Sequence, residues 1–254
     1  MATAEQTVDK SDARVREMFG QIAGRYDFLN HLLSLNIDRY WRWRTVRAVP
    51  PRRGGKILDL CTGTGDLALA YHKASGGTAS ILGADFCYPM LALGREKCKK
   101  SPAEQTITFI EADAQHIPTV SNQFDVVCVA FGLRNVADTD RGLAEMTRVC
   151  ARGGRVAVLE FSTPQWQPFK SIYSWYFRNV LPRIGQFFAR NSQAAYEYLP
   201  ESVGQFMQGE ELAQRMRAVG LVDVSYRSFT LGVATLYVGT KPLSESAMAM
   251  ATRY

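Results

Sequence analysis

The feature that most constrains the fold of this chain is a glycine-rich turn after a short apolar run. The stretch KILDLCTGTGDLALAY, Lys56 to Tyr71, reads as a strand, a turn and the start of a helix. Glycines let the backbone of such a turn approach a ligand closely, because no side chain intervenes. The string GTGDLA, Gly63 to Ala68, also satisfies the pattern G-x-G-x-x-[GA]. The turn therefore predicts an α/β fold that binds a nucleotide-like ligand.

Short β-branched runs alternate with helical patterns through the middle of the chain. The expected strands are Lys56–Leu60, Ala79–Ala84, Thr106–Ile110, Phe124–Ala130 and Arg155–Phe161. The expected helices between them are Asp66–Lys73, Pro89–Lys100 and Thr139–Val149. This alternation indicates parallel βαβ units with helices on both faces of one sheet.

The C-terminal part has a different pattern. Glu210–Val219 reads as a helix that ends at Gly220, and two strands, VDVSYRSF and VATLYVGT, flank Leu231–Gly232. A tight hairpin at that point makes the last strand antiparallel to its neighbour. The prediction is a mostly parallel, seven-stranded sheet with a C-terminal antiparallel hairpin, which differs from the standard dinucleotide-binding fold.

Composition and charge narrow the class of protein. With 254 residues, 46% of them hydrophobic, the chain suits one large globular domain. No apolar run approaches the roughly 20 residues that cross a bilayer, and the N-terminus lacks the apolar centre of a secretory signal, so a cytoplasmic location is expected. The net charge of +6 is concentrated in two acid-free stretches, 39–58 and 161–196. No zinc-finger, RNP or helix-turn-helix pattern occurs, so we expect an anionic membrane or substrate and no nucleic acid.

Cysteines and histidines give no sign of a metal site. The five cysteines are odd in number and have no metal-clip or redox spacing, so we expect reduced packing residues. The histidines, at positions 31, 72 and 116, have no ligand spacing either.

Three aspartates distinguish two adenosine-containing ligands. Asp85 ends the second strand about 20 residues after Gly65, where a carboxylate can accept both ribose hydroxyls. Asp59 precedes the turn, where its charge suits a cationic ligand better than a pyrophosphate. Asp113 follows the third strand and can accept an adenine amino group. Each acid alone is also explained as a helix N-cap or a solvated loop end. Together with the hairpin, the set favours S-adenosylmethionine over NAD.

Several longer strings make the chain resemble a known family. YDFLNHLLSLNIDRYW (26–41), FGLRN (131–135), RVCARGGRVAVLEFS (148–162), NSQAAYEYLPES (191–202) and FTLGVATLYVG (229–239) carry the likeness. They resemble the ubiquinone/menaquinone biosynthesis C-methyltransferases, a branch of the class I S-adenosylmethionine-dependent methyltransferases. The chain departs from the family pattern at Leu29, Asp38 and the triplet 150–152.

The resemblance implies a reaction and a set of cofactor contacts. The reaction is methyl transfer from S-adenosylmethionine to a ring carbon of a polyprenylated quinol. Demethylmenaquinol is the preferred substrate, and 2-methoxy-6-polyprenyl-1,4-benzoquinol is the alternative. Thr64, Asp85, Asp113 and Ala114 carry over by motif as cofactor-binding positions; Asp59, Gly63 and Gly65 complete that set from the turn itself. A nicotinamide-dependent oxidoreductase and a non-catalytic quinone-binding scaffold are the competing functions.

The chemistry of quinol methylation selects candidate catalytic residues. A quinol carbon attacks well once a neighbouring hydroxyl is ionised, and the phenol pKa of about 10 makes that anion scarce at neutral pH. Arg134 follows the fourth strand and is the candidate partner for the anion; its structural alternative is a helix cap or a pair with Asp138. Asn135 is expected to orient the substrate or a water. Tyr26 is expected to contact the sulfonium, or to pack as a lid aromatic. His116 is a weaker candidate base.

A basic and aromatic stretch, Pro168 to Arg190, predicts lipid contact. Phe169, Ile172, Tyr173, Tyr176 and Val180 fall on one helical face, and the charges of Lys170, Arg178, Arg183 and Arg190 are unopposed by any acid. A cover packed on the sheet is the alternative.

The expected layout is one methyltransferase domain over 1–254. It has a helical lid (1–50), a cofactor-binding core (51–162), a helical insert facing substrate and membrane (163–208), a last helix with the hairpin (209–241) and a tail (242–254). Transient contact with an anionic membrane surface is expected, as is a homodimer or a quinone-biosynthesis complex.

Overall fold

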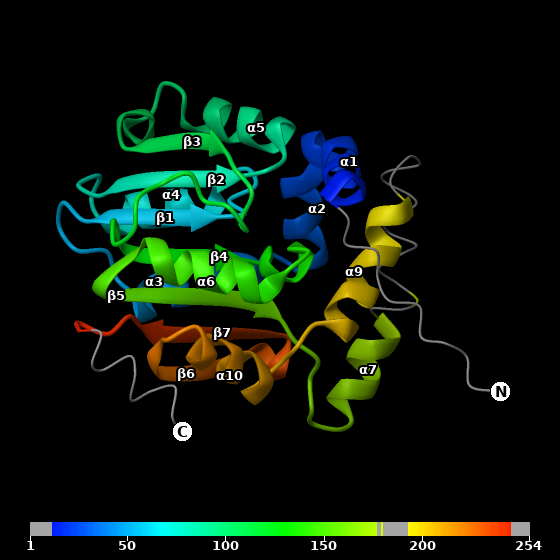
Figure 1. Ribbon diagram of the computed structural model, residues 1–254. Coiled ribbons are helices and arrows are strands. Elements are labelled where there is room, and N and C mark those ends of the chain that lie inside the picture. The colour runs from blue at the N-terminus through cyan, green and yellow to red at the C-terminus, as the bar shows by residue number, and fades with distance from the viewer. Residues whose placement is uncertain (1–11, 177–178, 180–192, 245–254) are drawn as a thin grey trace.

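The chain folds around one seven-stranded sheet. The computed structural model describes residues 12–176, 179 and 193–244. The strands are β1 (Lys56–Leu60), β2 (Ser80–Asp85), β3 (Ile107–Glu111), β4 (Phe124–Ala130), β5 (Cys150–Phe161), β6 (Val222–Phe229) and β7 (Ala234–Thr240). Their order is β3-β2-β1-β4-β5-β7-β6 (Figure 1). Strands β1 to β5 pair in parallel, and β7 runs antiparallel to both β5 and β6, so the predicted fold class is confirmed.

Alternating apolar residues give the sheet two buried faces. In β1, Ile57 belongs to one hydrophobic cluster, whereas Leu58 and Leu60 belong to another. In β5, Leu159 and Val158 divide in the same way. Successive side chains of a strand point to opposite faces, and a parallel sheet covered on both sides is apolar on both.

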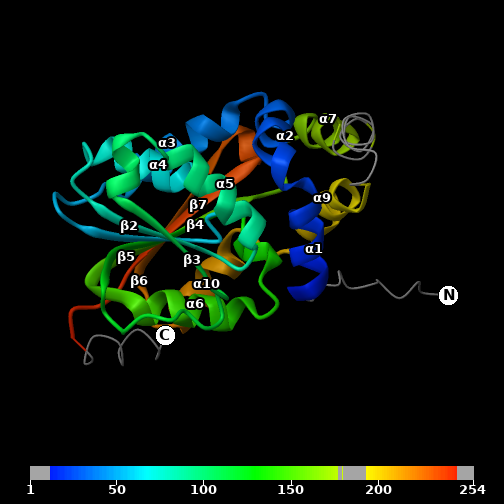
Figure 2. The same cartoon turned by 90° about the horizontal axis from the view of Figure 1, so that it is seen from above.

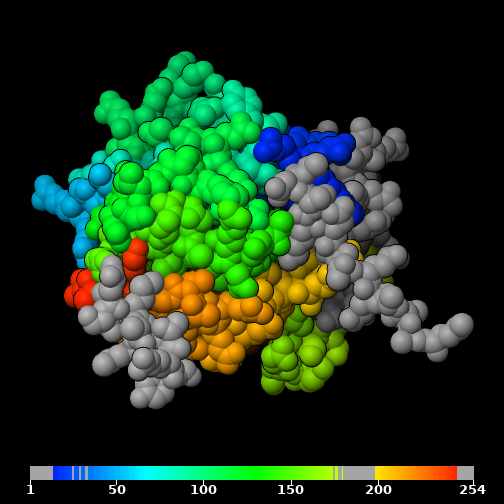
Figure 3. Space-filling model, in the orientation of Figure 1, coloured from blue at the N-terminus to red at the C-terminus, as the bar shows by residue number. Residues whose placement is uncertain are grey.

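Helices cover both faces. The helices α3 (Ile37–Ala48), α4 (Asp66–Ala74) and α5 (Tyr88–Cys98) lie on one face, and α6 (Thr139–Val149) and α10 (Glu210–Ala218) lie on the other (Figure 2). The segments of α6 and α10, green and orange, form much of the surface seen in Figure 3. Among the described residues, no helix has the length and apolar character needed to span a membrane.

Within the described residues, four more helices gather at the carboxyl ends of the parallel strands. These are α1 (Asp12–Ile22), α2 (Tyr26–Leu33), α7 (Phe169–Trp175) and α9 (Gln193–Gln205) (Figure 1). Open α/β sheets bind ligands at this edge, where the strand order reverses between β1 and β4. The helices therefore enclose the edge where a ligand is expected.

The start of β5 shows the largest difference between a predicted and an observed element boundary. The strand expected from Arg155 begins at Cys150, because a register shift against β4 accommodates the glycine pair Gly153–Gly154 without ending the strand. Only the first part of the predicted lipid-facing helix is described, as α7. Phe177, Arg178, Val180, Arg183 and Arg190 lie outside the described residues.

Candidate active site

Asp59 holds the glycine turn from behind. Its Oδ2 accepts hydrogen bonds from Thr62 Oγ1 at 2.6 Å and from the Ala68 amide at 3.1 Å. Burial raises the pKa of Asp59 to about 7, against the opposing effect of those two bonds. Asp59 lines neither of the cavities described below. Asp59 therefore shapes the turn, and its effect on a cationic ligand stays a prediction.

Gly63 and Asp85 meet across the two first strands. The Gly63 amide donates to Asp85 Oδ2 at 2.8 Å, and the Cys87 amide donates to Oδ1 at 2.8 Å. Gly63 has φ 57, a left-handed value that favours glycine. Burial raises the pKa of Asp85, against the effect of hydrogen bonds from the Cys87, Gly63 and Phe86 amides.

A smaller cavity of about 50 Å³ opens beside this pair. It is lined by the predicted cofactor residues Gly63, Asp85, Asp113 and Ala114, together with Asn135. The Asn135 Oδ1 atom is buried and has no hydrogen-bond partner among the residues that the structure describes. An amide oxygen in that state indicates a missing donor, such as one from a ligand or a water.

A larger cavity of about 420 Å³ adjoins the smaller one. Its wall is mainly aromatic and aliphatic, and includes Trp41, Phe161, Phe169, Tyr173 and Tyr176. The helical face predicted for lipid contact therefore faces this cavity in its described part. Phe19, Tyr26 and Phe131 line both cavities and form the partition between them.

Phe131 adopts an unusual backbone conformation in this partition. Its φ is 59, a left-handed value that is uncommon for a bulky residue. Its ring packs against Phe161 with centroids 4.4 Å apart and against Trp41 at 5.8 Å. The next residue must be glycine, because a Cβ on Gly132 would lie 2.4 Å from the Cβ of Cys61.

Arg134 is a buried cation in the wall of the larger cavity. Its NH1 group donates to Glu160 Oε2 at 3.1 Å, its backbone amide donates to Oε1 at 3.2 Å, and NH1 also donates to the Phe131 carbonyl. The guanidinium lies 5.4 Å from the centre of the Phe161 ring. Its Nε atom is buried without a hydrogen-bond partner among the described residues. Arg134 thus pairs with Glu160 and not with Asp138.

The side chains of α2 face two ways. Tyr26 and Asn30, one helical turn apart, line the larger cavity and are linked by a hydrogen bond. Burial is the main reason that the pKa of the Tyr26 phenol is raised, while the bond to Asn30 and the charge of Arg134 oppose the rise.

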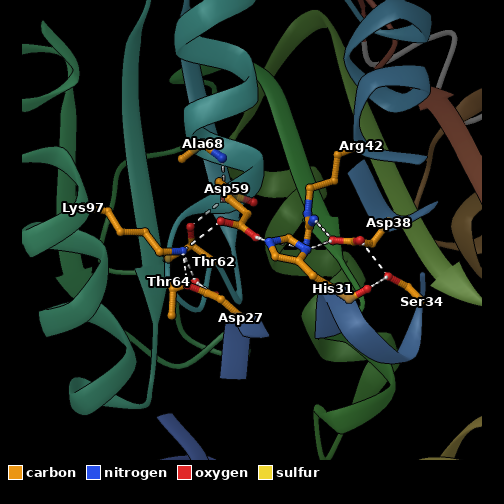
Figure 4. A network of polar contacts seen from close by, with 11 residues as sticks. Asp27, His31, Ser34, Asp38, Arg42, Asp59, Thr62, Thr64, Ala68 and Lys97 are labelled. Carbon is orange, nitrogen blue, oxygen red and sulfur yellow. Dashed lines mark hydrogen bonds and ion pairs between the residues drawn. The ribbon is translucent and has the colours of Figure 1, made fainter. Parts of the chain in front are cut away.

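On its other side, α2 is fastened to the glycine turn by a charged cluster (Figure 4). Thr64 Oγ1 donates to Asp27 Oδ1 at 2.5 Å. The Lys97 ammonium reaches Asp27 at 2.5 Å, Thr64 at 2.7 Å and Asp66 at 2.8 Å. We call Asp27, Thr64, Asp66 and Lys97 the clasp. Thr64 is engaged within the clasp and does not line either cavity, and its predicted contact with the cofactor stays a prediction.

The cluster continues to α3 through His31 and Arg42. His31, Asp38 and Asp66 bring ligand-type atoms within 4.8 Å of one another, which the sequence spacing did not indicate. Arg42 contacts both carboxylates, so a fixed cation already lies between them. At Asp38, where the resembled family has histidine, burial favours the neutral acid, but the bond from Ser34 and the charge of Arg42 outweigh it and lower the pKa.

Other residues lie away from the cavities. His116 is exposed beside Asp113 and Arg141, and Asp138 caps α6 by accepting from the Arg141 amide at 3.0 Å. Gly65 is packed under the Phe109 ring. All five cysteines are free, as expected.

Sequence reasoning missed several residues that shape the site. Glu160 and Trp41 lie inside the strings that resemble the family, so the sequence indicated that they are near the site but not which residues they contact. Lys97 and Arg42 had no signal, because their partners lie on other elements of the fold.

The sheet order, the antiparallel β7 and the glycine turn beside Asp85 define a class I S-adenosylmethionine-dependent methyltransferase. Comparisons with known proteins agree with this class. Residues 7–241 match the ubiE/COQ5 methyltransferase family, and the chain belongs to that family.

Curated relatives cover most of the chain. The ubiquinone/menaquinone biosynthesis C-methyltransferase UbiE of Geobacter sulfurreducens is 47% identical over 91% of this chain and 89% of its own length. The demethylmenaquinone methyltransferase of Bacteroides fragilis is 40% identical over 91% of this chain and 94% of its own length.

A solved structure supports the fold. A methyltransferase of Thermotoga maritima described as a possible histamine N-methyltransferase superposes with a TM-score of 0.60 and 17% identity, covering 89% of this chain and 98% of its own. The family membership confirms the predicted S-adenosylmethionine-dependent methyltransferase and gives no support to a nicotinamide-dependent oxidoreductase.

Proposed function

We propose that this enzyme methylates a ring carbon of a polyprenylated quinol, with demethylmenaquinol as the preferred substrate. The observation that carries the proposal is the larger cavity, which is mainly apolar, has the buried Arg134 guanidinium in its wall and adjoins the cofactor-type cavity. A quinol head group with a hydrocarbon tail has the same combination of a few polar atoms and a large apolar surface. The names of the relatives from Geobacter and Bacteroides support this substrate class.

The residues of the smaller cavity fit S-adenosylmethionine. Asp85 presents a carboxylate for the ribose hydroxyls, the Gly63 backbone permits close approach, and Asn135 has an unused amide oxygen. Asp113 and Ala114 border the part of the cavity assigned to adenine. Bound there, the cofactor supplies an electrophilic methyl group. Asp59, Thr64 and Gly65 shape the turn and contribute indirectly.

Four residues serve the quinol side. Arg134 stabilises the phenolate that makes the ring carbon nucleophilic, because it lines the cavity and a guanidinium can donate to an anionic oxygen. Glu160 fixes the orientation of that guanidinium. Tyr26, in the partition, would face the sulfonium of a bound cofactor, and Asn135 would orient the substrate or a water.

The experiment is single-turnover methylation of a soluble demethylmenaquinol analogue between pH 6 and 10. Arg134→Ala should lower the rate by about 10² or more, comparable to the loss of one oxyanion donor. Its remaining activity should climb toward high pH, because the substrate must then ionise near its solution pKa of about 10. Arg134→Lys should recover part of the rate.

Two controls interpret the result. Circular dichroism checks folding, because Arg134→Ala leaves Glu160 buried without its cation. The affinity for S-adenosylmethionine should change little. A folded Arg134→Ala variant with the wild-type rate at pH 7 would make Arg134 structural. Absence of S-adenosylhomocysteine formation by wild type with either quinol precursor would favour a quinone-binding scaffold.

We also infer transient association with an anionic membrane surface, because a polyprenyl quinol resides in lipid. The exposed Ile172 and Trp175 of α7 support this inference.

A further inference from the structure

The larger cavity opens between three elements that expose apolar side chains. Leu35 in the α2–α3 turn and Ile172 in α7 both line the cavity, yet they are 74% and 61% exposed, so they lie at its rim. Thr230 in the β6–β7 turn also lines it, and the neighbouring Leu231 is 61% exposed. An apolar rim that surrounds an apolar cavity indicates a surface that is covered when the enzyme works.

The outer side of α3 extends this rim with aromatic rings and arginines. Tyr40 and Trp43 are 42% and 51% exposed. The Arg44 guanidinium lies 5.6 Å from the Tyr40 ring centre and 5.0 Å from that of Phe229, and Arg47 lies 5.4 Å from that of Trp43. Aromatic rings with attached cations suit the boundary between water and hydrocarbon.

This side of α3 is contiguous with the rim. Trp41 Nε1 donates to Thr230 Oγ1 at 2.8 Å, and the Tyr40 and Phe229 rings pack edge to face with their centroids 6.2 Å apart. These contacts fix α3 against the β6–β7 turn. Seen from above, α3, α2 and α7 lie along the same side of the molecule (Figure 2).

The charge of this side is uncompensated. Six arginines occur between Asp38 and Asp59 without an acid. Arg42 and Arg52 have carboxylate partners. Within the described part of the chain, Arg39, Arg44 and Arg47 form no ion pair. Three arginines without an ion pair, two of which lie over aromatic rings, fit an anionic lipid surface better than an acidic protein groove, because the neighbouring rim is hydrocarbon-like.

We propose that this side of the molecule docks on an anionic bilayer with the cavity mouth facing the lipid. The docking face consists of Leu35, Arg39, Tyr40, Trp43, Arg44, Arg47, Ile172 and Leu231. A long-chain quinol then passes from the bilayer into the cavity without exposing its tail to water. The identity of the lipid-borne substrate rests on the proposed function, whereas the docking face rests on its own residues.

The test compares two charge-reversed variants that carry the same change in net charge. Arg44→Glu/Arg47→Glu alters the docking face. Arg215→Glu/Arg217→Glu alters exposed arginines of α10, on the opposite side of the sheet, and is the matched control. Flotation with vesicles of phosphatidylcholine, with and without phosphatidylglycerol, measures binding.

Wild type and the α10 control should bind the anionic vesicles at least tenfold better than the neutral ones, and salt should release them. Arg44→Glu/Arg47→Glu should lose at least tenfold of that binding. Trp43→Ser should weaken binding several-fold without altering net charge. The docking proposal is overturned if wild type ignores anionic vesicles, or if both charge-reversed variants bind equally.

Activity separates docking from catalysis. With a short-chain soluble quinol, Arg44→Glu/Arg47→Glu should match wild type within twofold; with a long-chain quinol in vesicles it should fall at least tenfold. Equal losses with both substrates would place these arginines in the site and overturn the docking proposal. If only Arg44→Glu/Arg47→Glu loses vesicle binding and wild type methylates neither quinol, the docking proposal stands and the proposed substrate is overturned.

Discussion

Replacing Glu160 by glutamine should strongly destabilise the protein, although the two side chains have nearly the same shape. Glu160 is 1% exposed and Arg134 is 6% exposed, so the pair has little contact with water. The carboxylate accepts three hydrogen bonds, from the Arg134 amide, the Arg134 guanidinium and the Phe161 amide. Glutamine offers one oxygen and turns an N–H group toward one of these donors.

The magnitude follows from the charge and from this mismatch. Removing one partner of a buried ion pair costs about 3–5 kcal/mol, because the other charge stays buried without compensation. For a chain of this size that corresponds to a fall in Tm of roughly 10 °C. Glu210→Gln removes an exposed partner of Arg217 and should cost no more than about 1 kcal/mol.

The assay is urea unfolding followed by tryptophan fluorescence, since Trp41 is buried in the core. The midpoint should fall for Glu160→Gln with an unchanged slope. Adding Arg134→Met removes the stranded charge, so the double variant should be more stable than Glu160→Gln alone. Two results would refute the argument that Glu160 compensates the buried charge of Arg134. One is a loss of less than about 1 kcal/mol in unfolding free energy for Glu160→Gln, and the other is a double variant that is less stable than Glu160→Gln.

Three further results are expected. Lys97→Met leaves two carboxylates of the clasp without their shared cation, so S-adenosylmethionine should bind roughly fivefold more weakly and the amide hydrogens of α2 should exchange faster. Lys97→Arg should keep the wild-type affinity and the wild-type exchange rate. Unchanged exchange in Lys97→Met would show that the clasp does not hold α2. Asp59 keeps its proton in the folded protein up to a pKa of about 7, against 3.8 when unfolded, so its burial penalty grows as pH rises through that window. Asp59→Asn should therefore gain stability over wild type between pH 4 and 8, by at most on the order of 4 kcal/mol in urea titrations, and parallel pH profiles would contradict this. Asp85→Ala should weaken S-adenosylmethionine binding roughly 10- to 150-fold by calorimetry; an unchanged constant would remove its ribose role.

The sheet could be predicted from the sequence because its signal is local. Alternating apolar residues such as Ile57 and Leu58 report directly which face each side chain covers. The hairpin at Leu231–Gly232 could also be predicted from the sequence, and both residues have positive φ in the structure. Strand ends were less certain, since the extension of β5 to Cys150 depends on its pairing with Phe124.

The partners within the site could not be predicted, because the register of the sheet and the packing of helices decide them. Arg134 lies nearer in sequence to Asp138, but the parallel pairing of β4 with β5 places Glu160 beside it. The contacts of Thr64 could not be predicted either, because its hydroxyl forms hydrogen bonds with Asp27 of α2 and Lys97 of α5. A motif assigns such residues to a site without saying which side chains they contact.

The left-handed backbone of Phe131 has a consequence for attempts to stabilise this enzyme. A non-glycine residue in that conformation costs roughly 1–2 kcal/mol, and glycine would remove the cost. A redesign that scored only the backbone conformation would choose glycine at position 131. The ring, however, is part of the partition between the two cavities, and its loss would join them into one space. Loss of a buried phenylalanine ring costs about 3–5 kcal/mol, which exceeds the backbone relief, so glycine at this position should lower both the stability of the enzyme and its rate of methyl transfer.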